Sequence, residues 1–262
     1  MKLAFCYSGG LSETLTMAFF QTCYKSSALN IECGINVILP NNPKSQNLPC
    51  VWLFHGLSDD HTCWQRFSAI ERHAREFQVG VVMPAVNRSF YTDMQSGGKY
   101  YTYLADELPR VMRAFFPLSD KRADNFVAGL SMGGYGAFLL GLSKPENYAA
   151  AATFSGAMDI AGVYKNIQPD MAWAFGNKSP AGTDADLFHL LRKRVADKAK
   201  LPQLWMYCGA KDFLYDDNLR MCAELRKLKV PFEYSESPTH EHAWDYWDLC
   251  IADFIAKLPL KK

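Results

Sequence analysis

The chain has 262 residues, with 28 basic and 27 acidic side chains and a hydrophobic fraction of 49%. This balance is typical of a globular protein and excludes a disordered chain, which would combine low hydrophobicity with high net charge. A formal net charge of +1 argues against a nucleic-acid partner, because such binders usually carry a basic excess. No apolar run approaches the roughly 20 residues of a membrane span, so no membrane partner is expected.

The N-terminal segment and the cysteines indicate a reducing compartment. A secretory signal needs an apolar core of about 7 to 15 residues, and the run Leu3–Cys6 is much shorter. The eight cysteines show no C-x-x-C spacing and are interpreted as reduced, packed thiols. We expect a cytoplasmic protein without a metal or a cofactor.

Short apolar runs that end in turn residues predict strands along the whole chain. In chain order they are Ile35–Leu39, Val51–Phe54, Val79–Met83, Phe126–Ala128, Ala151–Phe154, Leu204–Tyr207 and Phe232–Glu236. Most are apolar throughout, as strands buried on both faces must be. The last one alternates, which is typical of a strand nearer an edge.

Helical periodicity fills the segments between these strands. The predicted helices are Trp64–Phe77, Tyr101–Phe116, Gly134–Leu142, Asn218–Leu228 and Tyr246–Leu258. Strands that alternate with helices predict an α/β fold with a mostly parallel sheet covered on both faces. Ligands of such sheets bind at the carboxyl ends of the strands, so the loops there are the candidate site.

The segment Gly129-Leu130-Ser131-Met132-Gly133 fits G-x-S-x-G, with a predicted strand before it and a predicted helix after it. A serine becomes an effective nucleophile when such a turn exposes it to a histidine. Larger side chains at the two flanking glycines would collide with the strand and the helix. A phosphate loop would continue with Gly-Lys-Ser or Gly-Lys-Thr, which is lacking here, and a plain flexible loop is the other alternative. Ser131 is therefore the predicted nucleophile.

The acid and the base are expected after the serine, on loops that follow later strands. Asp212 lies just beyond the predicted strand Leu204–Tyr207. Asp216 and Asp217 are its rivals, but they directly precede a predicted helix and are explained by capping it. Asp212 is therefore the favoured acid.

His240 and His242 follow the last predicted strand and precede the last predicted helix, where a base is expected. No carboxylate or cysteine cluster with ligand spacing stands nearby, which argues against a metal site. The residues alone do not decide between the two, although the apolar start of the next helix favours His242. We interpret His61, His73 and His189 as solvated surface histidines.

Acyl transfer also needs two backbone N–H donors for the oxyanion. One belongs to the residue after the serine, Met132, and the other to a loop after an earlier strand. His55-Gly56-Leu57 ends a predicted buried strand, and Gly56 permits a turn that would aim the Leu57 N–H at the pocket. An ordinary strand-to-helix turn is the alternative interpretation.

Four segments together resemble the putative esterase family of α/β-hydrolases, which groups bacterial tributyrin esterases with esterase D and S-formylglutathione hydrolases. These segments are 53–62 with Trp64, 129–134, 209–215 and 242–247. The resemblance runs from about Phe20 to the C-terminus and looks closest to the tributyrin-esterase branch. It implies an α/β-hydrolase fold with Ser131 as nucleophile, Asp212 as acid and His242 as base. It also implies Leu57 and Met132 as oxyanion donors.

The resemblance also suggests how the chain is divided. Relatives begin near Met17, so residues 1–16 are expected to be a poorly packed extension and residues 17–262 a single domain. The long segment of about 157–200 is interpreted as a small cap of short helices over the serine. Trp173 and Phe175 are expected either to line an acyl pocket or to pack this cap onto the sheet.

We therefore expect a serine carboxylesterase that hydrolyses short-chain acyl esters of small molecules. The alternatives are a thioesterase of the S-formylglutathione hydrolase type, a deacetylase of acylated carbohydrates and, from another class, a non-catalytic hydrolase-fold binding module. A homo-oligomer is left open, because relatives often assemble and the composition does not decide it.

Overall fold

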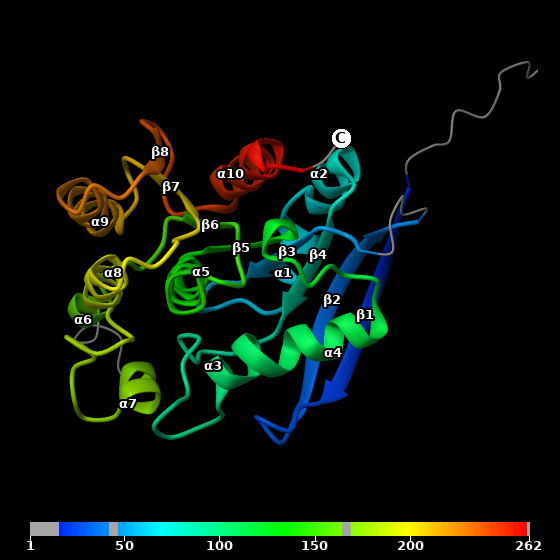
Figure 1. Cartoon of the computed structure of the whole chain (residues 1–262), viewed down its shortest axis with the longest axis horizontal. Helices are drawn as coiled ribbons and strands as arrows, with labels where there is room; N and C mark the ends of the chain where they lie inside the picture. The colour runs from blue at the N-terminus through cyan, green and yellow to red at the C-terminus, as the bar shows by residue number, and fades with distance from the viewer. Residues whose placement is uncertain (1–15, 42–46, 164–168, 261–262) are drawn as a thin grey trace, which may run out of the picture.

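The computed structural model describes residues 16–41, 47–163 and 169–260. Eight strands form one sheet in the order β1-β2-β4-β3-β5-β6-β7-β8 (Figure 1). Their bounds are β1 Met17–Lys25, β2 Glu32–Pro40, β3 Cys50–Phe54, β4 Gly80–Pro84, β5 Asn125–Leu130, β6 Ala150–Phe154, β7 Gln203–Gly209 and β8 Phe232–Ser237. The predicted strands are confirmed, each within a few residues of its expected bounds.

The sheet is mostly parallel. Strand β1 pairs with β2 and β2 with β4 in antiparallel fashion, whereas every pair from β4 to β8 is parallel. Strands β3, β5 and β6 are buried at every residue. Strand β8 alternates between half-buried and exposed residues because it forms one edge.

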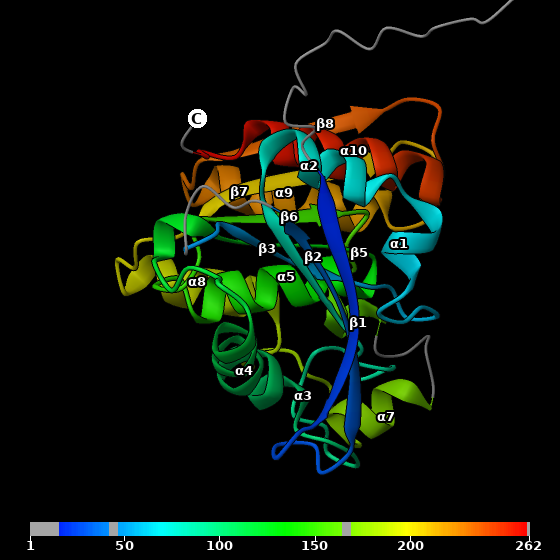
Figure 2. The ribbon, with the colours of Figure 1, turned by 90° about the vertical axis from the view of Figure 1, so that its right-hand side faces the viewer.

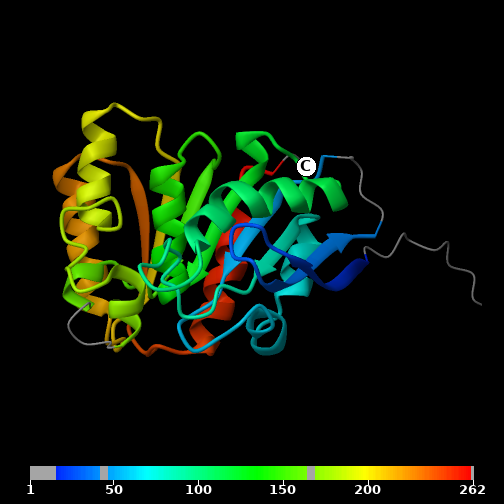
Figure 3. The same ribbon diagram turned by 90° about the horizontal axis from the view of Figure 1, so that it is seen from below.

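Helices cover both faces. On one face lie α1 Cys63–Phe67, α2 Ile70–Phe77 and α10 Trp244–Lys257. On the other lie α3 Tyr100–Thr102, α4 Leu108–Phe115, α5 Met132–Ser143, α6 Ile160–Val163, α7 Asp170–Phe175, α8 Leu187–Ala196 and α9 Tyr215–Lys227. Figure 2 shows α2 and α10 on one side of the sheet and α4, α5 and α8 on the other, and Figure 3 views this second layer from below.

The single helix predicted over Trp64–Phe77 is wrong, because the chain breaks after Phe67. Ser68 is extended, with φ −135° and ψ 171°. Its hydroxyl donates to the Trp64 carbonyl at 2.5 Å, so the side chain competes with the helical backbone. The Ala69 N–H instead donates to Asp248 of α10 at 2.8 Å. The hydrogen bond at this break thus links α1 and α2 to the last helix.

The helix predicted over Tyr101–Phe116 is present but changes its winding. A π-helical turn, η1 (Tyr103–Glu107), stands between α3 and α4, and a short 3₁₀ turn, η2 (Arg122–Asp124), precedes β5. The π turn presents Glu107, whose carboxylate accepts hydrogen bonds from Ser26, Ser27 and Ala28 at 2.8–3.1 Å. This carboxylate clamps the hairpin between β1 and β2.

The expectation for residues 1–16 concerns residues that, apart from Thr16, lie outside the described part. No helix in the described part of the chain is both long and apolar enough to cross a bilayer.

Candidate active site

Ser131 stands alone between β5 and α5. Its backbone has φ 52° and ψ −118°, a conformation that residues with a side chain rarely adopt. Such strain is what a sharp strand-to-helix turn imposes on the residue it presents. The next residue, Met132, begins α5, so its N–H is one of the amides that a helix N-terminus leaves without an intrahelical partner.

The two flanking glycines are required by close contacts, as predicted. A Cβ at Gly129 would collide with the backbone of Gly133. A Cβ at Gly133 would come within 2.6 Å of the carbonyl oxygens of Phe54 and His55. Strand β5, helix α5 and the end of β3 therefore pack so closely that no side chain larger than hydrogen fits at these two positions.

The loop after β7 brings Asp212 to His242. His242 Nδ1 lies 2.8 Å from Asp212 Oδ2 and 3.0 Å from Oδ1, so the Nδ1–H donates to the carboxylate. The Asp212 side chain is 0% exposed and also accepts the Leu214 N–H at 2.8 Å. This fixes the imidazole and leaves Nε2 for a second partner.

Asp212 remains a carboxylate despite its burial. Burial alone would raise its pKa, but hydrogen bonds from His242, Ser155 and the Leu214 N–H outweigh that effect and hold the pKa below its usual range. Sequence reasoning missed Ser155, which is fully buried and has φ 50°. Its hydroxyl accepts the Trp247 indole N–H at 3.1 Å. Only its position after a buried strand could have singled it out.

The structure separates the two neighbouring histidines. His240 Nδ1 lies 2.5 Å from the Ser237 hydroxyl, and its ring stacks on Tyr246 with centroids 4.8 Å apart. Only His242 of this pair contacts Asp212. The rival acids do not act as caps, which corrects the prediction: α9 begins at Tyr215, so Asp216 and Asp217 lie within its first turn.

The loop after β3 is anchored by a buried histidine. His55 Nδ1–H donates to the Gly56 carbonyl at 2.7 Å, and Nε2 accepts the Val86 N–H at 3.0 Å. Burial lowers the pKa of His55 to about 4, which keeps the ring neutral. A Cβ at Gly56 would lie 2.7 Å from Leu130, so this loop packs against the Ser131 turn.

A cavity of about 900 Å³ joins these parts, a size within the usual range for small-molecule sites. Its lining includes Ser131, His242, Leu57 and Met132, so the five predicted site residues, apart from the buried Asp212, face one space. Its apolar wall comes from aromatic and aliphatic side chains, namely Phe90, Leu130, Val163, Phe213, Leu214, Trp244 and Trp247.

The two cap aromatics lie elsewhere. Trp173 is 49% exposed and does not line the cavity. Phe175 packs behind Phe90, with ring centroids 6.2 Å apart. The acyl-pocket interpretation of these two residues is therefore wrong, and Phe175 takes the packing role.

Three charged residues of the lining were not anticipated. Asp59 lies in the segment 53–62 that carries the family resemblance and Asp217 was a rival acid, but no role in lining the cavity was predicted for either of them or for Arg220. Arg220 donates to Asp159 at 2.7 Å and to Asp217 at 2.5 Å.

Two of the histidines interpreted as solvated are not. The side chain of His73 is 15% exposed and pairs with Asp248 at 3.0 Å. His61 is half-buried against Gly34, where an added Cβ would meet its ring at 2.6 Å. The side chain of His189 is 42% exposed, so this histidine is more solvated than His73.

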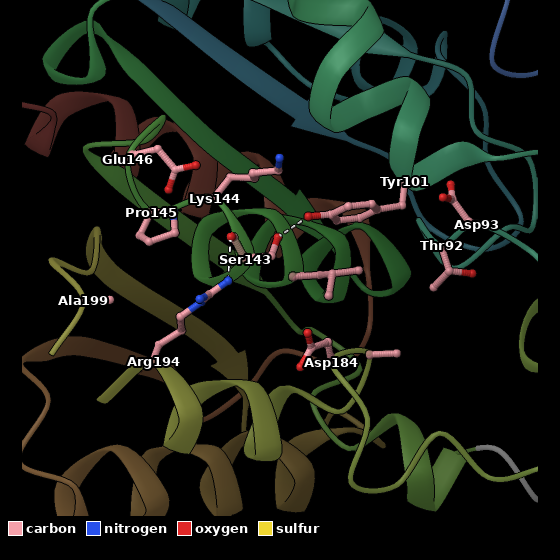
Figure 4. Close-up of a pocket in the computed structure, with 12 residues that line it drawn as sticks. Thr92, Asp93, Tyr101, Ser143, Lys144, Pro145, Glu146, Asp184, Arg194 and Ala199 are labelled. Carbon is pink, nitrogen blue, oxygen red and sulfur yellow. Dashed lines mark hydrogen bonds between the residues drawn. The ribbon is translucent and has the colours of Figure 1, made fainter. Parts of the chain in front are cut away.

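A second hollow of about 690 Å³ lies beside the C-terminal end of α5 (Figure 4). Its two basic side chains are used in structural contacts: Arg194 donates to the carbonyls of Leu142 and Ser143, and Lys144 pairs with Asp106. None of the predicted site residues lines this hollow.

Comparison with known proteins identifies the family. The family model described as putative esterase matches residues 26–259. The chain belongs to the putative esterase family. An acetyl esterase of Caldicellulosiruptor saccharolyticus is 30% identical over 257 residues, which cover 90% of this chain and 96% of that protein.

Two solved structures from Staphylococcus aureus are similar to this esterase. The fluorophosphonate-binding serine hydrolase FphF superposes with a TM-score of 0.89 at 34% identity, over 94% of this chain and all of the other. The S-formylglutathione hydrolase FrmB gives 0.86 at 34% identity, over 92% and 98%. The protein thus has the α/β-hydrolase fold and is a serine esterase, a hydrolase that acts on ester bonds.

Proposed function

We propose that the protein is a carboxylesterase for short-chain acyl esters, tributyrin among them, with Ser131, His242 and Asp212 as its catalytic triad. The observation that supports this best is the cavity that Ser131 and His242 both line, with the His242 Nδ1–H held by Asp212 at 2.8 Å. The cavity walls are largely apolar, which suits a short acyl chain.

The reaction follows from the roles of these groups. Ser131 Oγ attacks the ester carbonyl while His242 Nε2 takes its proton. The Leu57 and Met132 N–H groups stabilise the oxyanion of the tetrahedral intermediate, and the N-terminal end of α5 adds its dipole. His242 then gives the proton to the leaving alcohol. Water repeats these steps on the acyl-enzyme and releases the acid.

Asp212 keeps the imidazole in the tautomer that can accept a proton. Its lowered pKa, with burial outweighed by hydrogen bonds from His242 and Ser155, means that it stays ionised and stabilises the imidazolium that forms. This part of the proposal needs no metal and no cofactor.

Two related activities remain candidates because of named relatives. The likeness to FrmB favours a thioesterase acting on S-formylglutathione, and the acetyl esterase favours hydrolysis of acetyl esters, for which acylated carbohydrates are one candidate class. Hydrolysis rates for p-nitrophenyl acetate, tributyrin, S-formylglutathione and acetylated xylo-oligosaccharide, measured side by side, would separate the three.

Fluorophosphonate labelling tests the nucleophile directly. We expect wild type to be labelled on the peptide that contains Ser131, and Ser131→Ala to remain unlabelled with ester hydrolysis reduced by several orders of magnitude. Ser155→Ala is a useful comparison, because it removes another serine near the site but should still label. Retained turnover in Ser131→Ala would refute the assignment.

We also propose that residues 17–262 are one domain, with about 157–200 as a cap. Helices α6, α7 and α8 lie in this segment, and Val163 of α6 lines the cavity.

The seven described cysteines are unpaired, which supports a reducing, cytoplasmic location. Whether the enzyme forms a homo-oligomer can be measured by sedimentation.

A further inference from the structure

The cavity around Ser131 carries more negative than positive charge among its described residues. Asp59 and Asp217 line it, and Arg220 is the one described lysine or arginine that does so. Arg220 is shared between two carboxylates, Asp159 and Asp217. No described cation forms an ion pair with Asp59. The cavity therefore offers no unpaired cation to an anionic substrate, as far as the structure describes it.

Asp59 lies beside the nucleophile. A Cβ added to Gly56 would be 2.9 Å from Asp59 Oδ2 and 3.7 Å from Ser131 Cβ, so the carboxylate and the serine adjoin the same point of the loop. Burial raises the pKa of Asp59 and of Asp217, which means that water stabilises both negative charges poorly. Arg220 already pairs with Asp217, so Asp59 is the carboxylate to which a bound cation would supply the stabilisation that water does not.

The region next to His242 must receive the leaving group, because His242 gives its proton to the departing oxygen. Phe213 covers that ring, with centroids 4.4 Å apart, and is itself 77% exposed. Trp244 and Trp247 line the same region. Aromatic faces attract cations, most strongly where water is partly excluded.

These features deepen, and rest on, the proposed esterase function. We propose that the cavity prefers esters whose alcohol carries a positive charge, with the carboxylates of Asp59 and Asp217 and the ring of Phe213 receiving the ammonium group. The chemistry is unchanged: the acyl group passes to Ser131 and then to water, and the ammonium alcohol leaves with the proton from His242. Glutathione thioesters, which carry a net negative charge, are disfavoured.

Three acetate esters of similar size test this preference. Acetylcholine and 3,3-dimethylbutyl acetate have the same shape and differ by one positive charge, and 3-acetoxypropionate carries a negative charge. We expect kcat/KM to fall in the order cation, neutral, anion, with about tenfold between the first two at low salt. Added salt should narrow this gap. Equal kcat/KM values for the first two would overturn the proposal.

Isosteric variants identify the groups responsible. Asp59→Asn and Asp217→Asn should each reduce the cation-to-neutral ratio several-fold, and the second also frees Arg220 from one carboxylate. Asp216→Asn is the matched control, since Asp216 is exposed in the same helical turn, does not line the cavity and has the same charge. Its ratio should not change.

The outcomes separate the two proposals. A ratio that is unchanged in both Asp59→Asn and Asp217→Asn, with normal thermal melting, would refute the charge preference alone. Absence of hydrolysis of all three esters by wild type would refute the esterase proposal, and the preference with it. The ratio of kcat/KM for the cationic ester to that for the neutral ester in wild type tests the preference without any variant. Poor folding of a variant therefore cannot protect the proposal from refutation.

Discussion

The Cα of Gly133 lies against the carbonyl oxygen of Phe54, and a Cβ there would come within 2.6 Å of it. The obstacle is backbone of β3, which cannot move without disturbing the centre of the sheet. We therefore expect Gly133→Ala to lower the free energy of unfolding by about 1–3 kcal/mol and to reduce ester hydrolysis, because the Ser131 turn must shift. Chemical denaturation and initial rates measure both effects.

Gly97→Ala is the control for that substitution. The nearest atom to its added Cβ is the sulfur of Met94, on a flexible side chain that can move aside. Should Gly133→Ala unfold at the same denaturant concentration as Gly97→Ala and keep full activity, the close approach is not as the structure has it.

Asp212→Asn tests the acid. An amide can hold the His242 ring but favours the wrong tautomer, so we expect kcat to fall roughly 10⁴-fold with little change in stability. Asp216→Asn should retain normal kcat. If Asp216→Asn or Asp217→Asn instead caused the large loss in kcat for a neutral ester, the acid would have been misassigned.

His55 makes stability depend on pH. Its pKa is about 4 in the folded protein, lowered by burial, against about 6.5 in the unfolded chain. Between these values the unfolded chain binds a proton that the folded protein excludes, so stability is lost as the pH falls. His55 alone should lower the free energy of unfolding by about 3 kcal/mol from pH 7 to pH 4.

Two variants isolate this contribution. His55→Gln should be less stable at pH 7 but should show a flatter pH dependence between pH 6.5 and 4.5, a window above the range where carboxylates lose their stabilisation. His189→Gln, at an exposed position, should follow wild type. Parallel curves for all three proteins would contradict the buried, neutral state of His55.

Glu107 should stabilise the fold without affecting catalysis. Its carboxylate accepts four hydrogen bonds from residues 26–28, and these outweigh burial and lower its pKa. Glu107→Ala should lower the free energy of unfolding by about 1–3 kcal/mol, because the buried Ser26 hydroxyl and the half-buried Ala28 N–H lose their partner. It should also speed amide exchange in residues 26–31. Asp106→Ala, at the exposed neighbour, should cost far less. An activity loss that exceeds the unfolded fraction would count against a purely structural role.

The sequence was most informative where one residue type has one local explanation. The apolar runs of β3, β5 and β6 were predicted as buried strands, and Gly129 and Gly133 were predicted to flank a crowded turn in preference to a flexible loop. The expected chain order of serine, acid and histidine indicated Asp212 and the pair His240 and His242, and the family resemblance then favoured His242.

What could not be predicted depends on side-chain direction and on distant partners. The helix break at Ser68 is stabilised by Asp248, 180 positions further along the chain from that serine. Ser155 and Asp59 acquire their surroundings from loops that spacing cannot orient. For Trp173 and Phe175 the sequence could not decide between pocket and packing roles, because hydrophobicity does not identify the neighbour against which a residue packs.

The nucleophile strand β5 has β3 on one side and β6 on the other, with α5 packed across them. No partial opening at an edge of the sheet can loosen the Ser131 turn while leaving the rest intact. Amide hydrogens of the Ser131 turn should therefore exchange only through global unfolding, whereas the loop that carries His242 follows the edge strand β8 and can open first on heating.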